Sequence, residues 1–343
     1  MAPPDDLAAV APAEPTAAPR ARRSRAWWIV GLVVFGLLIQ LPNPFEELFW
    51  GSFAPRRIDR PSIPDGERRA ASAERLVLLI SFDGLAKTVL ERHMPSTIAD
   101  LVRDGSVAAF ANDLSDSTLE SHGVTISSQP AEESGFSAHT YRPWSRFRGP
   151  TIFTVCAREG LRCALLVGKA KLAALVAREP GCERFEYLRD PGRGGSGRQV
   201  LDATLAYIRE RDPDFVMVHL PDIDVVGHRS GWGSDPQLEA LTVLDVALRD
   251  FLVAASMATS RHLAILISAD HGGYGRSHRE GRPEVSQVPW ILWGDGIPHG
   301  LIAAEVSQLD TAPTVAALLG VATPREWRGQ NRVPVAPATA PSR

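Results

Sequence analysis

Short apolar runs alternate along the chain with stretches in which apolar residues recur every three or four positions. The continuous runs are typical of strands covered on both faces, and they lie at Leu76–Phe82, 106–111, 161–167, Phe215–Leu220, Leu263–Ser268 and Val288–Trp293. The helical pattern occurs at Lys169–Ala177, 197–211, 235–256 and 311–319, and a further helix starts near Pro95. Alternating strands and helices predict a doubly wound α/β fold, with helices on both faces of a mainly parallel sheet.

Three aspartates follow the predicted strands. Asp83 comes directly after the first run, Asp224 follows the run that ends at Leu220, and Asp270 follows the run that ends at Ser268. In a parallel sheet the ligand site lies beyond the carboxyl ends of the strands. The pattern therefore indicates that three carboxylates share one site.

The N-terminal segment has a different composition. Residues 1–19 are rich in Ala and Pro and, with the four arginines up to Arg25, are expected to form a disordered cytoplasmic tail, 1–25. The uncharged run that follows predicts a transmembrane signal-anchor at 26–42, although it is short for a helix that needs about 20 apolar residues. Arginines on its N-terminal side place everything after Pro42 outside the cytoplasm. A cleaved signal peptide and a buried helix are the alternatives.

The remaining boundaries follow from composition. Residues 43–74 contain several Pro and Arg without a period and are expected to be a linker, 75–331 form one catalytic domain, and 332–343 form a second disordered tail. The whole chain has 343 residues and a net charge of -3, which gives no electrostatic footprint for nucleic acid, so none is expected as a partner. The sequence does not predict an oligomeric state.

The three cysteines match no common zinc pattern. Cys156, Cys163 and Cys182 are an odd number, so at least one thiol has no partner within the chain. One disulfide is possible if the domain is exported, and the pair that would form it stays open.

Four short segments combine acids, histidines or hydroxyls with glycine. They are Ser81-Phe82-Asp83-Gly84, Ser117-Thr118-Leu119-Glu120-Ser121-His122, Pro221-Asp222-Ile223-Asp224-Val225-Val226-Gly227-His228, and Ser268-Ala269-Asp270-His271-Gly272-Gly273 followed by His278. Each segment alone fits a helix cap or a turn. Their order along one chain is more informative.

This order resembles the alkaline phosphatase superfamily, in particular its type I phosphodiesterase and nucleotide pyrophosphatase branch. The resemblance covers Leu76 to Gln330, and its most specific parts are Asp224-Val225-Val226-Gly227-His228 and Ser268-Ala269-Asp270-His271-Gly272. Pro289-Trp290-Ile291-Leu292-Trp293-Gly294 and Asp310-Thr311-Ala312-Pro313-Thr314 also look like the family.

The resemblance implies a Thr118 nucleophile and two divalent metals. One metal would be held by Asp83, Asp270, His271 and the hydroxyl of Thr118, and the other by Asp224, His228 and His278. Zinc suits carboxylate and imidazole ligands, while manganese or another divalent ion stays open. Cations would offset the repulsion among the carboxylates and lower the pKa of the threonine hydroxyl, which would attack phosphorus to give a phospho-threonine.

Some assignments have alternatives. Asp222 also precedes His228, but only Asp224 keeps the four-residue step, and Ser117 is an alternative nucleophile beside Thr118. Ser121 stands where the nucleotide pyrophosphatases carry a phosphate-binding Asn, which weakens the expectation of a nucleotide substrate.

Further residues are candidates for substrate binding. Ser121 and its neighbour His122 are two of them, and Lys169 and Lys171 are the others, because they resemble a Lys-x-Lys-Leu stretch of phosphonoacetate hydrolases. His219 lies within a strand and is expected in the core or behind the site.

We therefore expect a membrane-anchored, metal-dependent phosphodiesterase or phosphomonoesterase that acts outside the cytoplasm. A phospho-head-group transferase working at the membrane is the alternative. A sulfatase would need a Cys-x-Pro-x-Arg-like context, which Thr118 lacks, and the intact ligand set argues against a non-enzymatic binding protein. About 105 residues separate Thr118 from Asp224 and hold several core elements, so we expect an open site without a large cap domain.

Overall fold

The computed structural model of the chain describes residues 55–61, 74–107, 111–112, 115–136, 146–188, 197–279, 281–302 and 305–334. The predicted cytoplasmic tail, the predicted anchor at 26–42, most of the 43–74 linker and most of the 332–343 tail lie outside these ranges. Within these ranges, no helix combines the length and the apolar character that a membrane span requires.

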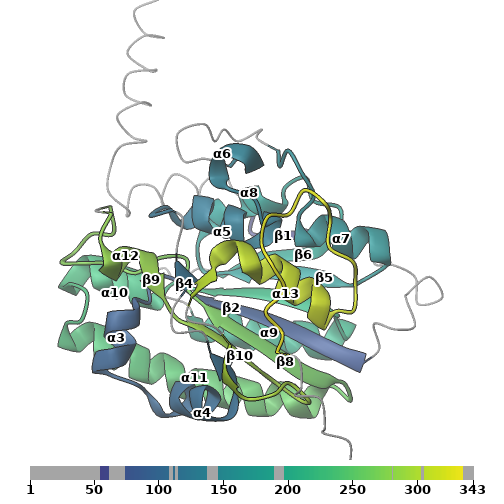
Figure 1. Cartoon of the computed structure of the whole chain (residues 1–343). Coiled ribbons are helices and arrows are strands. Elements are labelled where there is room, and N and C mark those ends of the chain that lie inside the picture. The colour runs from purple at the N-terminus through teal and green to yellow at the C-terminus, as the bar shows by residue number, and fades with distance from the viewer. Residues whose placement is uncertain are drawn as a thin grey trace, which may run out of the picture. The chain divides into compact units, whose positions relative to one another are not determined.

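A nine-stranded sheet forms the centre of the domain (Figure 1). Across the sheet its strands are β1 (Arg57–Asp59), β6 (Cys182–Tyr187), β5 (Cys163–Val167), β7 (Phe215–Leu220), β2 (Arg75–Phe82), β8 (His262–Ser268), β10 (Trp290–Gly294), β3 (Ser106–Val107) and β11 (Gly300–Leu301). The five central strands, from β6 to β8 in this order, run parallel to one another. The prediction of a mainly parallel sheet is confirmed.

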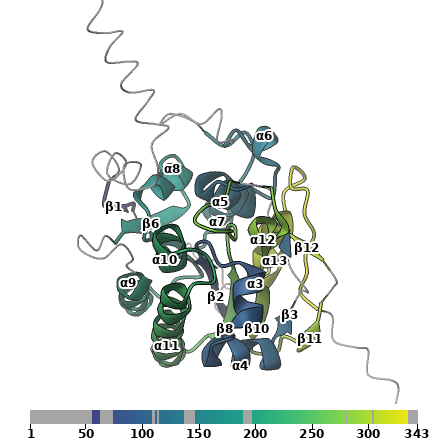
Figure 2. The same cartoon turned by 90° about the vertical axis from the view of Figure 1, so that its left-hand side faces the viewer.

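Helices cover both faces of this sheet, as Figure 2 shows in a view turned by 90°. One face carries α4 (Ser96–Asp104), α9 (Gly197–Arg211) and α11 (Asp235–Ala258), and the other carries α5 (Thr118–Ser127), α7 (Ile152–Glu159) and α13 (Thr311–Leu318). The shorter helices are α3 (Lys87–Arg92), α6 (Ala131–Ser134), α8 (Ala173–Val176), α10 (Asp222–Ser230) and α12 (Pro283–Ser286), with 3-10 turns η3 (Ala170–Leu172) and η4 (Gln308–Asp310). The doubly wound arrangement is confirmed.

Burial explains why the apolar runs identified the central strands. Leu76, Leu78 and Ile80 of β2 are fully buried, and so are the residues between them apart from a trace of exposure at Leu79. A strand with helices on both sides buries successive side chains on opposite faces, so its sequence has no polar alternation. Each such side chain contributes roughly 1.5–3 kcal/mol of transfer free energy.

Several edge elements differ from the prediction. The apolar run at 106–111 is not one strand: β3 pairs with β10, whereas β4 (Ala111–Asn112) belongs to a separate three-stranded sheet with β9 (Gln287–Val288) and β12 (Val306–Ser307). The run Val288–Trp293 divides in the same way between β9 and β10, and β10 is antiparallel to β8. Short edge strands lack the long apolar run on which the sequence reading depends.

Four strands were absent from the prediction: the two-residue strands β11 and β12, and the longer strands β6 and β1. β6 has the sequence CERFEY, in which charged residues interrupt the apolar pattern, and β1 lies within the stretch interpreted as a linker. Their charges are paired, because the guanidinium of Arg184 in β6 binds Asp59 of β1 at 2.7 Å and Glu210 of α9 at 2.8 Å. This pairing lets a polar strand lie next to the sheet edge.

The cysteines form one disulfide. Cys156 of α7 is bonded to Cys163 of β5, which ties a helix to the strand that follows it. Cys182 is the free thiol; it is fully buried in β6 opposite Cys163, and burial raises its pKa to about 12. The thiol of Cys182 therefore stays protonated and unreactive at neutral pH.

Candidate functional site

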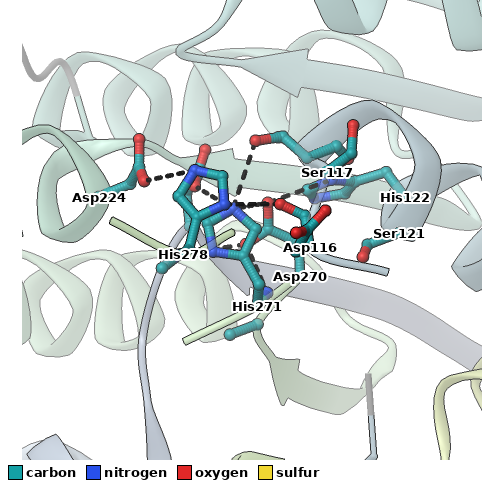
Figure 3. Close-up of polar contacts among 12 residues, drawn as sticks. Asp116, Ser117, Ser121, His122, Asp224, Asp270, His271 and His278 are labelled. Carbon is teal, nitrogen blue, oxygen red and sulfur yellow. Dashed lines mark hydrogen bonds and ion pairs between the residues drawn. The ribbon is translucent and has the colours of Figure 1, made fainter. Parts of the chain in front are cut away.

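The carboxyl ends of four parallel strands bring the predicted site residues together. Phe82 of β2 lies opposite Leu220 of β7, and β5 and β8 end at the same edge of the sheet. Lys169 follows β5, Asp83 follows β2, and the remaining acids and histidines come from α10 and from the loop after β8. Figure 3 shows that Asp224, Asp270, His271 and His278 point toward a common centre.

Asp83 has one bound oxygen and one open oxygen. Its Oδ2 accepts hydrogen bonds from Nζ of Lys169 at 2.6 Å and from Nε2 of His219 at 2.8 Å. Its Oδ1 has no hydrogen-bond partner among the described residues and lies 3.7 Å from Nε2 of His271. Burial alone would raise the pKa of Asp83, but Lys169 and His219 outweigh burial and hold this pKa well below its usual range. The carboxylate is ionised and presents one free oxygen to the site.

Asp224 repeats this arrangement on α10. Its Oδ2 accepts from Nζ of Lys169 at 2.6 Å, while its Oδ1 has no hydrogen-bond partner in the described ranges and lies 3.2 Å from Nε2 of His228. Asp222 points elsewhere, because its Oδ2 accepts from the backbone N–H of Gly197 at the start of α9. The structure therefore favours Asp224 over Asp222 as the site residue.

Asp270 and His271 lie in the loop after β8. Oδ1 of Asp270 accepts from the backbone N–H groups of Gly84 and His271, at 3.1 and 3.0 Å. Its Oδ2 has no hydrogen bond among the described residues and lies 3.4 Å from Nε2 of His271. Asp270 thus links the β2 and β8 loops through one oxygen and leaves the other directed at the site.

Three histidines present the same nitrogen to the site. Nδ1 of His228, His271 and His278 donates to a backbone carbonyl, of Arg276, Gly272 and Asp116 respectively, at 2.6–3.0 Å. A proton on Nδ1 leaves the lone pair on Nε2. Backbone anchoring of this kind fixes the orientation of histidines that bind metals.

The pKa values of two of these rings are shifted in opposite directions. Burial and the neighbouring His271 lower the pKa of His278 to about 2, so His278 is neutral at physiological pH. Burial would also lower the pKa of His228, but the Asp224 carboxylate outweighs burial and raises it. A proton therefore competes with a metal for Nε2 of His228 at acid pH.

These donor atoms fit divalent cations. Ligand atoms of Asp224, His228 and His278 lie within 4.8 Å of one another, and those of Asp83, Asp224 and His271 form a second group of the same size. The first group coincides with one predicted set. In the second group Asp224 takes the place predicted for Asp270, whose free oxygen borders His271. Buried, unpartnered carboxylate oxygens beside free imidazole nitrogens form a donor set that suits zinc or a similar ion.

Thr118 lies at the first turn of α5, next to these donors. The residue is 1% exposed, and its Oγ1 is 3.5 Å from Nε2 of His271. Ser117, the alternative nucleophile, is the N-cap residue of the same helix. The N-terminus of a helix favours anions, so a phosphate group next to Thr118 would be electrostatically stabilised.

The two candidate substrate-binding residues of α5 form hydrogen bonds within the protein. Oγ of Ser121 donates to the carbonyl of Ser115 at 2.9 Å. His122 donates from Nδ1 to the carbonyl of Thr118 at 2.6 Å and accepts at Nε2 from Oγ of Ser81 at 3.0 Å. Burial lowers the pKa of His122 to about 4, so the ring is neutral. These two side chains therefore stabilise the start of α5.

The two lysines of the Lys-x-Lys-Leu stretch are both buried. Lys169 is 4% exposed and binds Asp83 and Asp224, as described above. Lys171 lies in η3 and is 8% exposed. The structure places Lys169 against the metal-ligand candidates.

Trp232 belongs to the site and was absent from the sequence prediction. Its Nε1 donates to the carbonyl of Gly84 at 2.7 Å, and its ring packs edge-on against His228 with centroids 5.1 Å apart. A Cβ at Gly273 would lie 2.2 Å from this indole, and one at Gly227 would lie 2.9 Å from it. Both motif glycines therefore make room for one tryptophan, which lies in the turn between α10 and α11.

Gly84 explains the Asp-Gly pair after β2 and yields a prediction. Its φ is +75°, and a Cβ there would lie 2.9 Å from Cα of Asp224. In Gly84→Ala, the left-handed backbone costs about 1–2 kcal/mol and α10 must also move away. We expect a melting temperature lower by at least about 2–4 °C and weaker metal binding, measured by calorimetry. Gly281→Ala is the matched control, because no atom lies within 4 Å of its Cβ position; equal behaviour of the two variants would contradict the prediction.

Comparisons with known proteins agree with this fold. The family model described as "Type I phosphodiesterase / nucleotide pyrophosphatase" matches residues 77–275. A 2,3-bisphosphoglycerate-independent phosphoglycerate mutase of Cellvibrio japonicus is 29% identical over 144 residues, which are 40% of this chain and 27% of the mutase. The aligned part thus spans about a quarter of the length of the curated relatives.

Solved structures share the fold at low sequence identity. Human ectonucleotide pyrophosphatase / phosphodiesterase 5 is 13% identical with a TM-score of 0.58, over 74% of this chain and 97% of that one. A 2-O GAG sulfatase is 15% identical with a TM-score of 0.59, over 75% and 73% of the two chains. From its sequence match and its fold, the chain belongs to the type I phosphodiesterase / nucleotide pyrophosphatase family of the alkaline phosphatase superfamily.

Proposed function

We propose that this protein hydrolyses phosphate esters at a site with two divalent metals, and that Thr118 is the nucleophile. The observation that carries the proposal is the convergence of three buried carboxylates, each with one unpartnered oxygen among the described residues, on histidines that expose Nε2. An isolated buried carboxylate is costly, so three of them facing one centre call for positive charge there. The family match supports phosphate-ester chemistry.

The ligand assignment of the proposal keeps both predicted sets. Asp224, His228 and His278 would hold one metal, and Asp83, Asp270, His271 and the Thr118 hydroxyl would hold the other. Bound divalent cations lower the pKa of a hydroxyl and offset charge on phosphoryl oxygens. Thr118 would attack phosphorus in line with the leaving alcohol, and water would then hydrolyse the phospho-threonine.

The local sequence at the nucleophile supports phosphate over sulfate. Several structural relatives are sulfatases, but that likeness concerns the fold. Thr118 is flanked by Ser117 and Leu119, and no Cys or Ser here stands in the Cys-x-Pro-x-Arg-like context that oxidation to an aldehyde needs. The three cysteines lie in a disulfide and in β6.

Transfer of the phosphoryl group to an alcohol is the second candidate. The mutases that match part of the chain favour it, and so would a position near lipid head groups. We propose that residues 26–42 anchor the protein and that its catalytic domain faces away from the cytoplasm. The mature N-terminus tests the anchor, since processing after residue 41 would rule out its retention.

Product analysis separates these activities. The full chain is incubated with zinc or manganese and either p-nitrophenyl phosphate or bis-p-nitrophenyl phosphate, with glycerol present. From the monoester we expect nitrophenol and free phosphate. From the diester we expect nitrophenol and p-nitrophenyl phosphate. Glycerol phosphate as the main product would favour the transferase. A lack of nitrophenol from both compounds, while p-nitrophenyl sulfate is cleaved, would refute the phosphate-ester assignment.

A further inference from the structure

Lys169 connects the two predicted metal sets directly. Its Nζ lies 2.6 Å from Oδ2 of Asp83, which belongs to one set, and 2.6 Å from Oδ2 of Asp224, which belongs to the other. The side chain is 5% exposed and comes from the loop after β5, a different strand end from those that carry the acids. One ammonium group thus spans both halves of the site.

The oxygens that Lys169 binds are not the ones that face His228 and His271, the histidines of the two predicted metal sets. In both aspartates Oδ2 is engaged and Oδ1 has no hydrogen-bond partner among the described residues. Oδ1 of Asp83 lies 3.7 Å from Nε2 of His271, and Oδ1 of Asp224 lies 3.2 Å from Nε2 of His228. We call Oδ2, which Lys169 binds, the outer oxygen and Oδ1 the inner oxygen of each carboxylate. A carboxylate whose outer oxygen is fixed by a donor can rotate little, so its inner oxygen keeps one direction.

His219 completes this arrangement. Its Nε2 donates to the same Oδ2 of Asp83 at 2.8 Å, so that oxygen has two donors. Nζ of Lys169 lies at hydrogen-bond distance from both Oδ2 atoms, so the ammonium group donates to both carboxylates.

We propose that Lys169 is a positioning residue, which orients the inner oxygens of Asp83 and Asp224 toward the two metals and fixes the spacing between the two sets. This role rests on the proposed two-metal function and replaces the expectation that Lys169 contacts the substrate. An ammonium with 5% exposure, held by two carboxylates at 2.6 Å, has little freedom to reach a phosphate group.

When Lys169 is replaced, the loss of its charge and the loss of its hydrogen bonds predict opposite changes in metal affinity. Removing a positive charge next to two ligand carboxylates would by itself strengthen their attraction for a cation. Losing the donor that orients those carboxylates weakens metal binding, and outer partners of metal ligands typically contribute about 10–100-fold in affinity. Weaker binding after loss of the lysine charge therefore identifies a positioning role.

The test uses the full chain stripped of metal, titrated with zinc by calorimetry and with cobalt by visible absorption. We expect zinc binding to Lys169→Met to be about 10–100-fold weaker, with altered cobalt bands that report a changed coordination geometry. Lys169→Arg keeps the charge but places its donors differently, so it should lose less affinity and also shift the cobalt bands. Lys87→Met is the matched control: it removes the same charge close to Asp83 in the chain, but Lys87 pairs with Glu91 at the surface.

Each outcome decides the proposal. Wild-type affinity and cobalt bands in both Lys169 variants, or tighter zinc binding in Lys169→Met, would overturn it, and so would a raised KM with unchanged metal binding. If Lys169→Met does not fold, the Lys169→Arg spectrum and affinity decide alone. Failure of the wild-type protein to bind metal would instead count against the proposed function.

Discussion

Thr118→Ala should reduce the turnover of phosphate esters by at least about 10³-fold, because the nucleophile is lost while the rest of the site stays in place. Thr118 is buried at the start of α5 with its Oγ1 3.5 Å from Nε2 of His271. The methyl group of alanine fits the same space, so the melting temperature should change little. Steady-state hydrolysis of a nitrophenyl phosphate measures the effect.

Two neighbouring variants make this result specific. Thr118→Ser keeps a hydroxyl at the same position and should retain measurable activity, with phosphate trapped on the side chain under acid quench. Ser117→Ala removes the alternative nucleophile and should leave turnover close to wild type. If Ser117→Ala were the inactive variant and Thr118→Ala the active one, the nucleophile would have to be reassigned.

Removal of divalent metals should abolish activity and destabilise the fold. Asp83, Asp224 and Asp270 each direct an unpartnered oxygen into one buried site, and Lys169 supplies a single positive charge against them. A metal present at 100 times its Kd adds about 2.7 kcal/mol to the free energy of unfolding. We therefore expect chelation to lower the melting temperature by roughly 5–10 °C for each metal lost.

Add-back experiments control for damage by the chelator. Zinc, manganese and cobalt are returned separately to the stripped protein, and activity is compared with the bound metal measured by elemental analysis. Recovery with two equivalents of one metal supports the two-metal site. Full activity in protein shown to contain less than a tenth of an equivalent of metal would exclude it.

The sequence predicted the parts of the fold that depend on local pattern. Strands β2, β7 and β8 were identifiable because both of their faces are buried, and α11 because leucines recur along one face. β6 escaped detection because its charges are neutralised by partners far away in the chain, such as Asp59 with Arg184. The disulfide pair could not be chosen for the same reason, since spacing does not show which thiols meet in space.

The candidate site divides in a similar way. Asp83, Asp224 and His271 stand in short motifs whose order is recognisable, and the structure brings them together. The roles of His219, Lys169 and Trp232 depend on contacts between separate strand ends, and no local pattern reports such contacts. His219 was expected in the core or behind the site, and its hydrogen bond to Asp83 places it behind the site.

The order of the strands has a consequence for synthesis of the chain. β5, β7 and β2 lie side by side in the sheet. The loop after β8, which supplies Asp270 and His271, comes later in the chain than these three strands. Since chains generally fold from the N-terminal side as they emerge from the ribosome, Asp83 and Asp224 can meet before any residue beyond β8 exists. Lys169 emerges before Asp224, so its ammonium group can balance both carboxylates in a nascent sheet before translation delivers His271 and His278.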